Sequence, residues 1–236
     1  MTQPAVIVCA GGGGVGKTTT SAAIALAVAR TGRRVLIVSL DPARRLADAL
    51  GVALGTKARE LSVDAKDGVV FGLMPDPRDS LGTFAELLFE QEPAALDRLR
   101  ENRIYRALEA AVPGVHELAA IGLTWRAVDQ HSIDVVVIDT APSRNAVDFI
   151  GQPGRLAKLL RGRAVAWLSN IGQQAGSSTA TAKLGRVESL LVRVIGPAVR
   201  DVAALFTELA RVRERFLWIN EKTGELLLRP DTRYFL

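Results

Sequence analysis

The sequence predicts an α/β protein with a doubly wound, mostly parallel sheet and an inserted helical subdomain. Four apolar runs, at 5–10, 35–40, 69–74 and 133–139, are short and nearly free of polar residues. Such runs are typical of parallel strands that are buried on both faces. Segments with helical patterns separate them, which favours right-handed βαβ units. A glycine-rich loop directly follows the first run, as expected where such a sheet binds a ligand.

Length and composition fit one large domain. The chain has 236 residues, of which 48% are hydrophobic and 23% charged, so it can bury a full core without disulfides. We expect a single domain over 1–236. Its core comprises about 1–75 and 132–152, its helical subdomain about 76–131 and 153–216, and its divergent tail 217–236.

Helix signals flank the first two strands. An alanine-rich helix is expected from about 17 to 31, closed by Gly32. Asp41-Pro42 opens a second, short helix that ends at Gly51.

The longer helical regions run over about 76–130 and 155–216. The second contains a glycine- and serine-rich stretch, 172–178, which we expect to be a mobile loop. Apolar residues then recur every three or four positions as one helix face, interrupted at Gly196-Pro197; they are Leu191, Ile195, Val199, Val202, Phe206 and Leu209. In the tail, the apolar runs 216–219 and 225–228 predict a β-hairpin.

The loop after the first strand has the chemistry of a phosphate site. Residues 11–18 fit the pattern G-x-x-x-x-G-K-[ST] at every fixed position, with a strand before and a helix after. Glycines let backbone N–H groups turn toward a phosphate, and the helix adds its positive end. Lys17 would reach the terminal phosphates, and the Thr18 hydroxyl would coordinate Mg²⁺. The expected nucleotide-binding residues are Gly13, Gly14, Val15, Gly16, Lys17, Thr18 and Thr19.

Two aspartates end neighbouring strands and complete this site. Asp139 follows the fourth run and would hold Mg²⁺ through water, or else cap the next helix. Asp41 follows the second run and would orient or deprotonate an attacking water, or else cap the short helix. Thr140 and Ser143 are weaker candidates for sensing the terminal phosphate.

Four segments together resemble a known family. Gly-Gly-Val-Gly-Lys-Thr-Thr at 13–19, Asp-Pro-Ala at 41–43, Pro-Gly-x-x-Glu at 113–117 and Asp-Thr-Ala-Pro-Ser at 139–143 resemble the ArsA-type ATPases, the arsenite-pump and tail-anchored-protein targeting ATPases of the deviant-Walker-A class of P-loop NTPases. The resemblance covers most of 5–216. It implies ATP and Mg²⁺ as cofactors, catalytic roles for Lys17 and Asp41, and a homodimer bridged by nucleotide. Hydrolysis would be coupled to a helical region that binds a partner or cargo.

The chain departs from the family at several positions. Gly12 stands where the class has a lysine that reaches the partner's nucleotide, and Arg144 and Asn145 replace a glycine and a histidine of the second switch. Arg144 would either supply a replacement charge or lie solvated. Little after Phe216 matches the further strands of the family, so we expect a C-terminally truncated member.

Cargo and location are constrained by composition. One cysteine, Cys9, and two methionines argue against arsenite binding and against the methionine-rich cargo groove of the targeting enzymes. A single cysteine also favours the reducing cytoplasm. The start of the chain predicts no signal peptide, and no run is long enough to span a bilayer. The protein partner is unspecified.

Two other functions are compatible with the sequence. Gly12 and the short C-terminus would suit a nucleotide-binding module with weak or no hydrolysis. A basic stretch at 155–200, with eight basic residues and one acidic, would suit an ATPase of the ParA or MinD kind that touches DNA or anionic membrane, although a solvated face explains it as well. His116 and His131 lack metal-ligand spacing and are interpreted as structural.

Overall fold

The computed structural model describes residues 3–41, 43–108, 115–141 and 197–235. They fall into two compact units. The described parts of Met1–Phe84, Pro113–Pro153 and Ile219–Leu236 form the first, and those of Ala85–Val112 and Gly154–Trp218 form the second.

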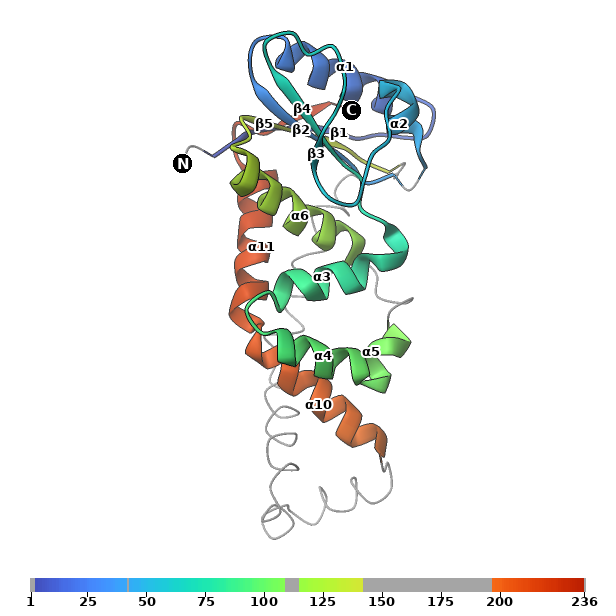
Figure 1. The fold of residues 1–236 in the computed structure, drawn as a ribbon, viewed down its shortest axis with the longest axis vertical. Coiled ribbons are helices and arrows are strands. Elements are labelled where there is room, and N and C mark those ends of the chain that lie inside the picture. The colour runs from blue at the N-terminus through green and yellow to red at the C-terminus, as the bar shows by residue number, and fades with distance from the viewer. Residues whose placement is uncertain (1–2, 42, 109–114, 142–196, 236) are drawn as a thin grey trace. The chain divides into compact units, whose positions relative to one another are not determined.

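A six-stranded sheet lies at the centre of the first unit (Figure 1). Its order is β3-β4-β2-β5-β1-β6, and every pairing is parallel except that between β3 and β4. The strands are β1 Ala5–Cys9, β2 Arg34–Ser39, β3 Arg59–Glu60, β4 Val69–Leu73, β5 Val135–Asp139 and β6 Arg233–Phe235. The predicted α/β class and the four apolar strands are therefore confirmed.

Helices cover both faces of this sheet. On one face lies α1 (Lys17–Ala29), whose Ala22, Ala25 and Ala29 pack against β2 and β5. On the other lies α6 (Val115–His131), which contacts β2 (Figure 1). All five residues of β5 are buried, and each large aliphatic side chain so buried contributes about 1.5–3 kcal/mol. The central strands are therefore the most firmly held part of the unit.

The short helix after β2 starts later than predicted. It is α2 (Arg45–Leu50), and Gly51 ends it with a φ of 66° as expected. Its start shifts because the Asp41 carboxylate accepts a hydrogen bond from the backbone N–H of Ala43 at 2.9 Å. This contact between residues i and i+2 is an Asx-turn, which competes with helix at that point.

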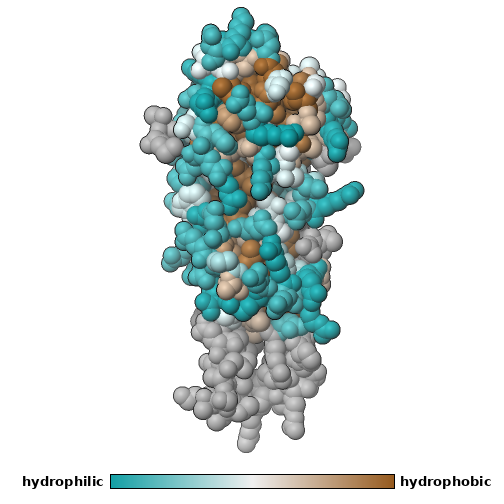
Figure 2. All heavy atoms as spheres, in the orientation of Figure 1, coloured by the Kyte–Doolittle hydropathy of each residue, from teal (hydrophilic) through white to brown (hydrophobic). Residues whose placement is uncertain are grey.

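The remaining helices include η1 (Pro77–Asp79), α3 (Ser80–Leu88), α4 (Pro93–Glu101), α5 (Arg103–Leu108) and α10 (Pro197–Arg211). In the second unit, Glu208 of α10 accepts hydrogen bonds from Arg98 of α4 at 2.8 and 3.0 Å and pairs with Arg211 at 3.2 Å. Hydrophilic side chains cover most of the face that Figure 2 shows around α3, α4 and α5. The predicted helical character of 76–130 is confirmed over its described residues.

The predicted β-hairpin in the tail is wrong. Residues 213–228 form one helix, α11 (Arg213–Leu228). Its buried positions, Phe216, Ile219, Thr223 and Leu227, are spaced by three and four, which is a helical period that the two apolar runs concealed. The Thr223 hydroxyl donates to the carbonyl of Ile219, one turn earlier, at 2.7 Å. Gly224 is thus an interior helix residue rather than part of a turn.

Two strands were not anticipated. β3 has two residues and β6 three, too few to show a period. β6 pairs in parallel with β1, so the tail does supply one further strand to the sheet.

Several expectations fall outside the described residues: the loop at 172–178, the basic stretch as far as 196, Ser143, Arg144 and Asn145. Both histidines contact neighbouring side chains, and His116 Nε2 is buried with no hydrogen-bond partner among the described residues. His116 Nδ1 is 2.8 Å from the Ser80 hydroxyl, and His131 stacks on Phe71 with ring centroids 4.5 Å apart. Within the described ranges, no helix is both long and apolar enough to cross a membrane.

Candidate functional site

The loop between β1 and α1 presents open backbone groups. Gly14 and Gly16 have φ values of 79° and 89°, a left-handed conformation that glycine adopts without steric cost. Gly16 is also the N-cap of α1 and provides no side-chain cap. The first N–H groups of the helix are therefore left for a ligand, and the helix dipole favours an anion there.

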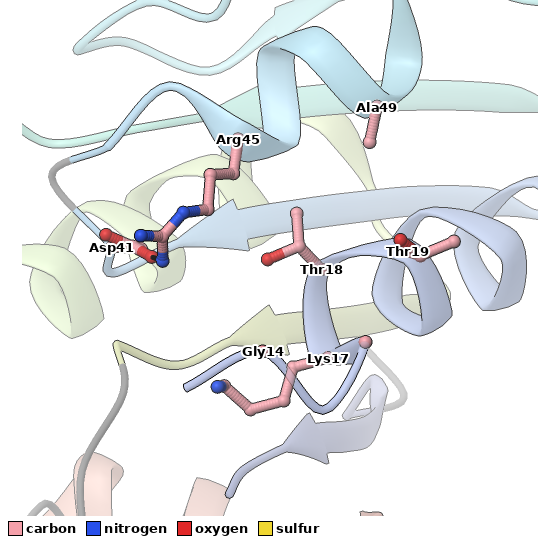
Figure 3. A pocket seen from close by; sticks show the side chains of 8 residues that line it. Gly14, Lys17, Thr18, Thr19, Asp41, Arg45 and Ala49 are labelled. Atoms are coloured by element: carbon pink, nitrogen blue, oxygen red, sulfur yellow. Dashed lines mark hydrogen bonds and ion pairs between the residues drawn. The ribbon is translucent and has the colours of Figure 1, made fainter. Parts of the chain in front are cut away.

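This loop borders a pocket of about 370 Å³ (Figure 3). Eight residues line it: Gly14, Gly16, Lys17, Thr18, Thr19, Asp41, Arg45 and Ala49. The Lys17 Nζ donates a hydrogen bond to the carbonyl of Gly12 at 2.7 Å, within the loop. Its ammonium is thus held beside the loop whose Gly14 and Gly16 line the same cavity.

Asp139 lies beneath the pocket at the end of β5. It is fully buried, and it pairs in register with Cys9 of β1 and Ser39 of β2. The Thr18 hydroxyl donates to its Oδ2 at 3.0 Å, and the Ser21 hydroxyl lies 3.2 Å from its Oδ1. Both carboxylate oxygens therefore face α1; the following segment, which Asp139 would otherwise cap, lies outside the described residues.

The surroundings of Asp139 disfavour the charged form of its carboxyl group. Burial raises the pKa of its carboxyl, and the nearby Asp41 raises that pKa further, while the hydrogen bonds from Thr18 and Ser21 and the charge of Lys17 lower it. Burial likewise raises the pKa of the Cys9 thiol, against a lowering contribution from Ser21. A bound cation would stabilise the charged form of the Asp139 carboxylate.

Asp41 lies at the end of β2, with 6% of its surface exposed. Its Oδ1 accepts from the Ala43 N–H, and its Oδ2 accepts from the Arg45 guanidinium at 2.9 Å. Figure 3 shows Asp41 and Arg45 together on the wall opposite Lys17. Thr140 is not among the lining residues, and its hydroxyl donates to the carbonyl of Cys9 at 2.9 Å.

The structure thus brings most of the predicted residues together. Gly14, Gly16, Lys17, Thr18, Thr19 and Asp41 line the pocket, and Asp139 supports Thr18. Gly13 and Val15 lie on the exposed loop but are not among the lining residues. Sequence reasoning missed Ser21 and Arg45. A signal for Arg45 existed, because it stands four residues after Asp41 at the start of a helix.

The donor set suits a magnesium ion. A threonine hydroxyl and a carboxylate are hard oxygen ligands, and Mg²⁺ usually binds one or two such groups together with water and phosphate oxygens. No group of three or more His, Cys, Asp or Glu side chains in the described ranges could hold a metal alone. The Thr18 hydroxyl and the Asp139 carboxylate fit a cation whose remaining ligands are water and phosphate oxygens.

The fold and this site define a nucleotide-binding α/β protein of the P-loop NTPase class. The sequence profile of the anion-transporting ATPases matches residues 4–217. The chain therefore belongs to the ArsA-type, anion-transporting ATPase family, as the motifs predicted.

Named relatives agree with this family. The chain is 33% identical to ATPase get3 of Aspergillus terreus over 168 residues, which are 70% of the chain and 46% of the relative. It is 31% identical to ATPase GET3 of Mycosarcoma maydis over 210 residues, 89% of the chain and 56% of the relative. The chain thus spans about half the length of the relatives it matches.

Proposed function

We propose that this chain binds ATP with Mg²⁺ and hydrolyses it, as a switch that couples nucleotide state to a helical region. Lys17 and the loop residues Gly13, Gly14, Val15, Gly16, Thr18 and Thr19 would bind the phosphates. Thr18 would bind Mg²⁺ directly and Asp139 through water, and the ion would neutralise phosphate charge. Asp41 would orient the attacking water or accept its proton.

One observation carries the proposal: the Thr18 hydroxyl is 3.0 Å from Asp139, at a pocket that Lys17 and Asp41 line. Thr18 and Asp139 are 121 positions apart in sequence. Only the folded sheet brings them together. A glycine-rich turn serving the fold alone would not need a buried carboxylate behind a helix-start hydroxyl.

The family also supports proposals on assembly. We expect two chains to close over the nucleotide, and a protein partner to engage the helices. The names of the relatives describe them only as ATPases. A cytoplasmic location is proposed from the single cysteine.

The test is phosphate release from ATP with and without Mg²⁺, for the wild type and Lys17→Ala. Removing a preorganised charge at the phosphates costs about 10²–10³ in rate. Arg30→Ala is the matched control, because Arg30 pairs with Asp64 at 2.8 Å on the exposed surface away from the pocket. Equal turnover in Lys17→Ala and wild type would refute the assignment.

A nucleotide-binding module with weak hydrolysis is the second candidate. It is favoured because both Asp41 oxygens already have partners, Ala43 N–H and Arg45. ATP binding by calorimetry with no phosphate release, in wild type at saturating ATP, would support it over the first candidate.

A further inference from the structure

Among the described residues that line the pocket, two have a cationic side chain, and the loop motif accounts for one of them. Lys17 is the first residue of α1, directly after the glycine-rich loop, whereas Arg45 comes from the first turn of α2. The Arg45 side chain is 59% exposed and lines the same cavity (Figure 3).

Arg45 has unused capacity for hydrogen bonding. A guanidinium carries five N–H donors in a planar fork. Within the described residues, one Arg45 nitrogen donates to Asp41, and the other nitrogens have no protein acceptor. Such a fork matches the geometry of phosphate oxygens, to which arginine bonds in bidentate fashion.

The ion pair between Arg45 and Asp41 is suited to replacement by a contact between Arg45 and a phosphate. The arginine side of this pair is open to water, which weakens the contact, and a polyphosphate carries more charge than one carboxylate. When Arg45 leaves, Oδ2 of Asp41 loses its partner, while the Ala43 N–H still holds Oδ1. The carboxylate stays in place and gains a free acceptor.

We propose that Arg45 is a phosphate-binding residue that distinguishes nucleoside triphosphate from diphosphate. It exchanges Asp41 for the terminal phosphate, which frees Asp41 only when the triphosphate is bound. This inference rests on the proposed function of the pocket.

A structural role would give a different result. If the pair only orders the turn at 41–45, losing Arg45 changes the affinities for triphosphate and diphosphate equally. If Arg45 binds the terminal phosphate, the two affinities separate, since the diphosphate lacks that group.

The experiment is calorimetry on the full chain with Mg²⁺ and either ADP or the non-hydrolysable triphosphate AMP-PNP. Loss of a hydrogen bond to a charged group predicts about 10–100-fold weaker AMP-PNP binding for Arg45→Gln, with ADP binding within about twofold of wild type. Arg45→Lys keeps the charge and recovers part of the loss. Arg30→Gln, at an exposed ion pair outside the pocket, leaves both affinities unchanged. Melting temperatures of all variants verify folding.

A second variant should change the affinity for AMP-PNP in the opposite direction. Asp41→Asn removes the competitor for Arg45, so AMP-PNP binding tightens while ADP binding stays constant. In the Arg45→Gln background the same change has no such effect. Equal shifts for the two nucleotides in Arg45→Gln, or no shift, would overturn the inference.

Failure of the proposed function has a separate signature. If wild type binds neither nucleotide, the pocket is not a nucleotide site and both ideas fail. If wild type binds both and Lys17→Ala loses both, while Arg45→Gln shifts neither or both equally, the nucleotide site stands and only the role of Arg45 is refuted.

Discussion

Two neighbouring parallel strands, β2 and β5, each end near an acidic residue, and the two ends differ in how the acid is held. At the β5 end, Asp139 is fully buried and its partners are the hydroxyls of Thr18 and Ser21. At the β2 end, Asp41 meets a backbone N–H and the exposed guanidinium of Arg45. We refer to them as the anchored end and the paired end.

The difference shows that the carboxyl ends of two neighbouring parallel strands can hold an aspartate for two different purposes. At the anchored end, two neutral hydroxyls offset only part of the cost of a buried charge, so burial raises the pKa of Asp139 and the site gains from a cation. At the paired end the charge is already compensated, by a side chain that can move. Binding of a cation that arrives with phosphate suits the first end, and nucleotide-dependent change suits the second.

The largest expected effect is on ATP turnover, and it distinguishes a catalytic role of Asp41 from a metal-binding role of Asp139. Asp41→Asn should lower ATP turnover about 10²–10⁴-fold, the range for loss of a general base, while nucleotide still binds. Asp139→Asn should instead weaken the Mg²⁺ dependence of binding. Steady-state phosphate release and calorimetry at several Mg²⁺ concentrations measure both.

If Asp41→Asn kept wild-type turnover, the paired end would have no catalytic part. If both variants lost Mg²⁺-dependent binding alike, the distinction between the ends would disappear.

The next effect is a loss of stability caused by a substitution in the loop that precedes Thr18. Gly16→Ala places a side chain at a φ of 89°, where the helix bearing Thr18 begins, and should cost about 1–2 kcal/mol of stability. Gly12→Ala is the matched control in the same loop, because a Cβ there meets nothing within 4 Å and its φ is not positive. Urea denaturation compares the two. Equal stability losses would show that the left-handed conformation at Gly16 is not what holds the start of α1.

Much of the anchored end was predictable from sequence, because its parts are local or periodic. The P-loop pattern fixes Lys17 and Thr18 next to each other, and a buried run ending in Asp139 gives the strand end. The partnership of Ser21 with Asp139 was missed, since it depends on the rotation of α1 against β5, which only packing sets.

The paired end and the tail were less predictable. The motif gave Asp41, but the Arg45 contact needs the turn at Asp41 that delays α2 to Arg45. In the tail, two apolar runs on either side of 220–224 imitate a hairpin, and tertiary burial of one face decides for helix α11 instead. The strand β6 has three residues, so its pairing with β1 is decided by the sheet edge available to it.

A smaller effect tests the buried charge. Because the folded-state pKa of Asp139 is raised, the folded protein binds a proton there more tightly than the unfolded chain. The stability of the wild type should therefore fall as pH rises from the ordinary carboxyl range through the raised pKa, and then stay level. Asp139→Asn lacks this charge and should be about 1 kcal/mol more stable than wild type at pH 7.5 without nucleotide.

The advantage of Asp139→Asn should shrink as pH falls and the wild-type carboxyl takes up its proton. Urea denaturation at pH 7.5, 6 and 5 measures this trend. A variant less stable than wild type at pH 7.5 would mean that the two hydroxyls compensate the charge fully, and the anchored end would then have no need of a cation.

The smallest effect is expected for the ion pair at the paired end. A double-mutant cycle with Asp41→Ala and Arg45→Ala should give a coupling of about 0.3–0.5 kcal/mol in stability, since the pair is exposed on the arginine side and spans four residues. The coupling should decrease in high salt, because screening weakens exposed pairs. Chemical denaturation of the four proteins at low and high salt measures it. A coupling of several times this size, insensitive to salt, would mean that Arg45 is fixed on Asp41 by the fold, and the two strand ends would then be anchored alike.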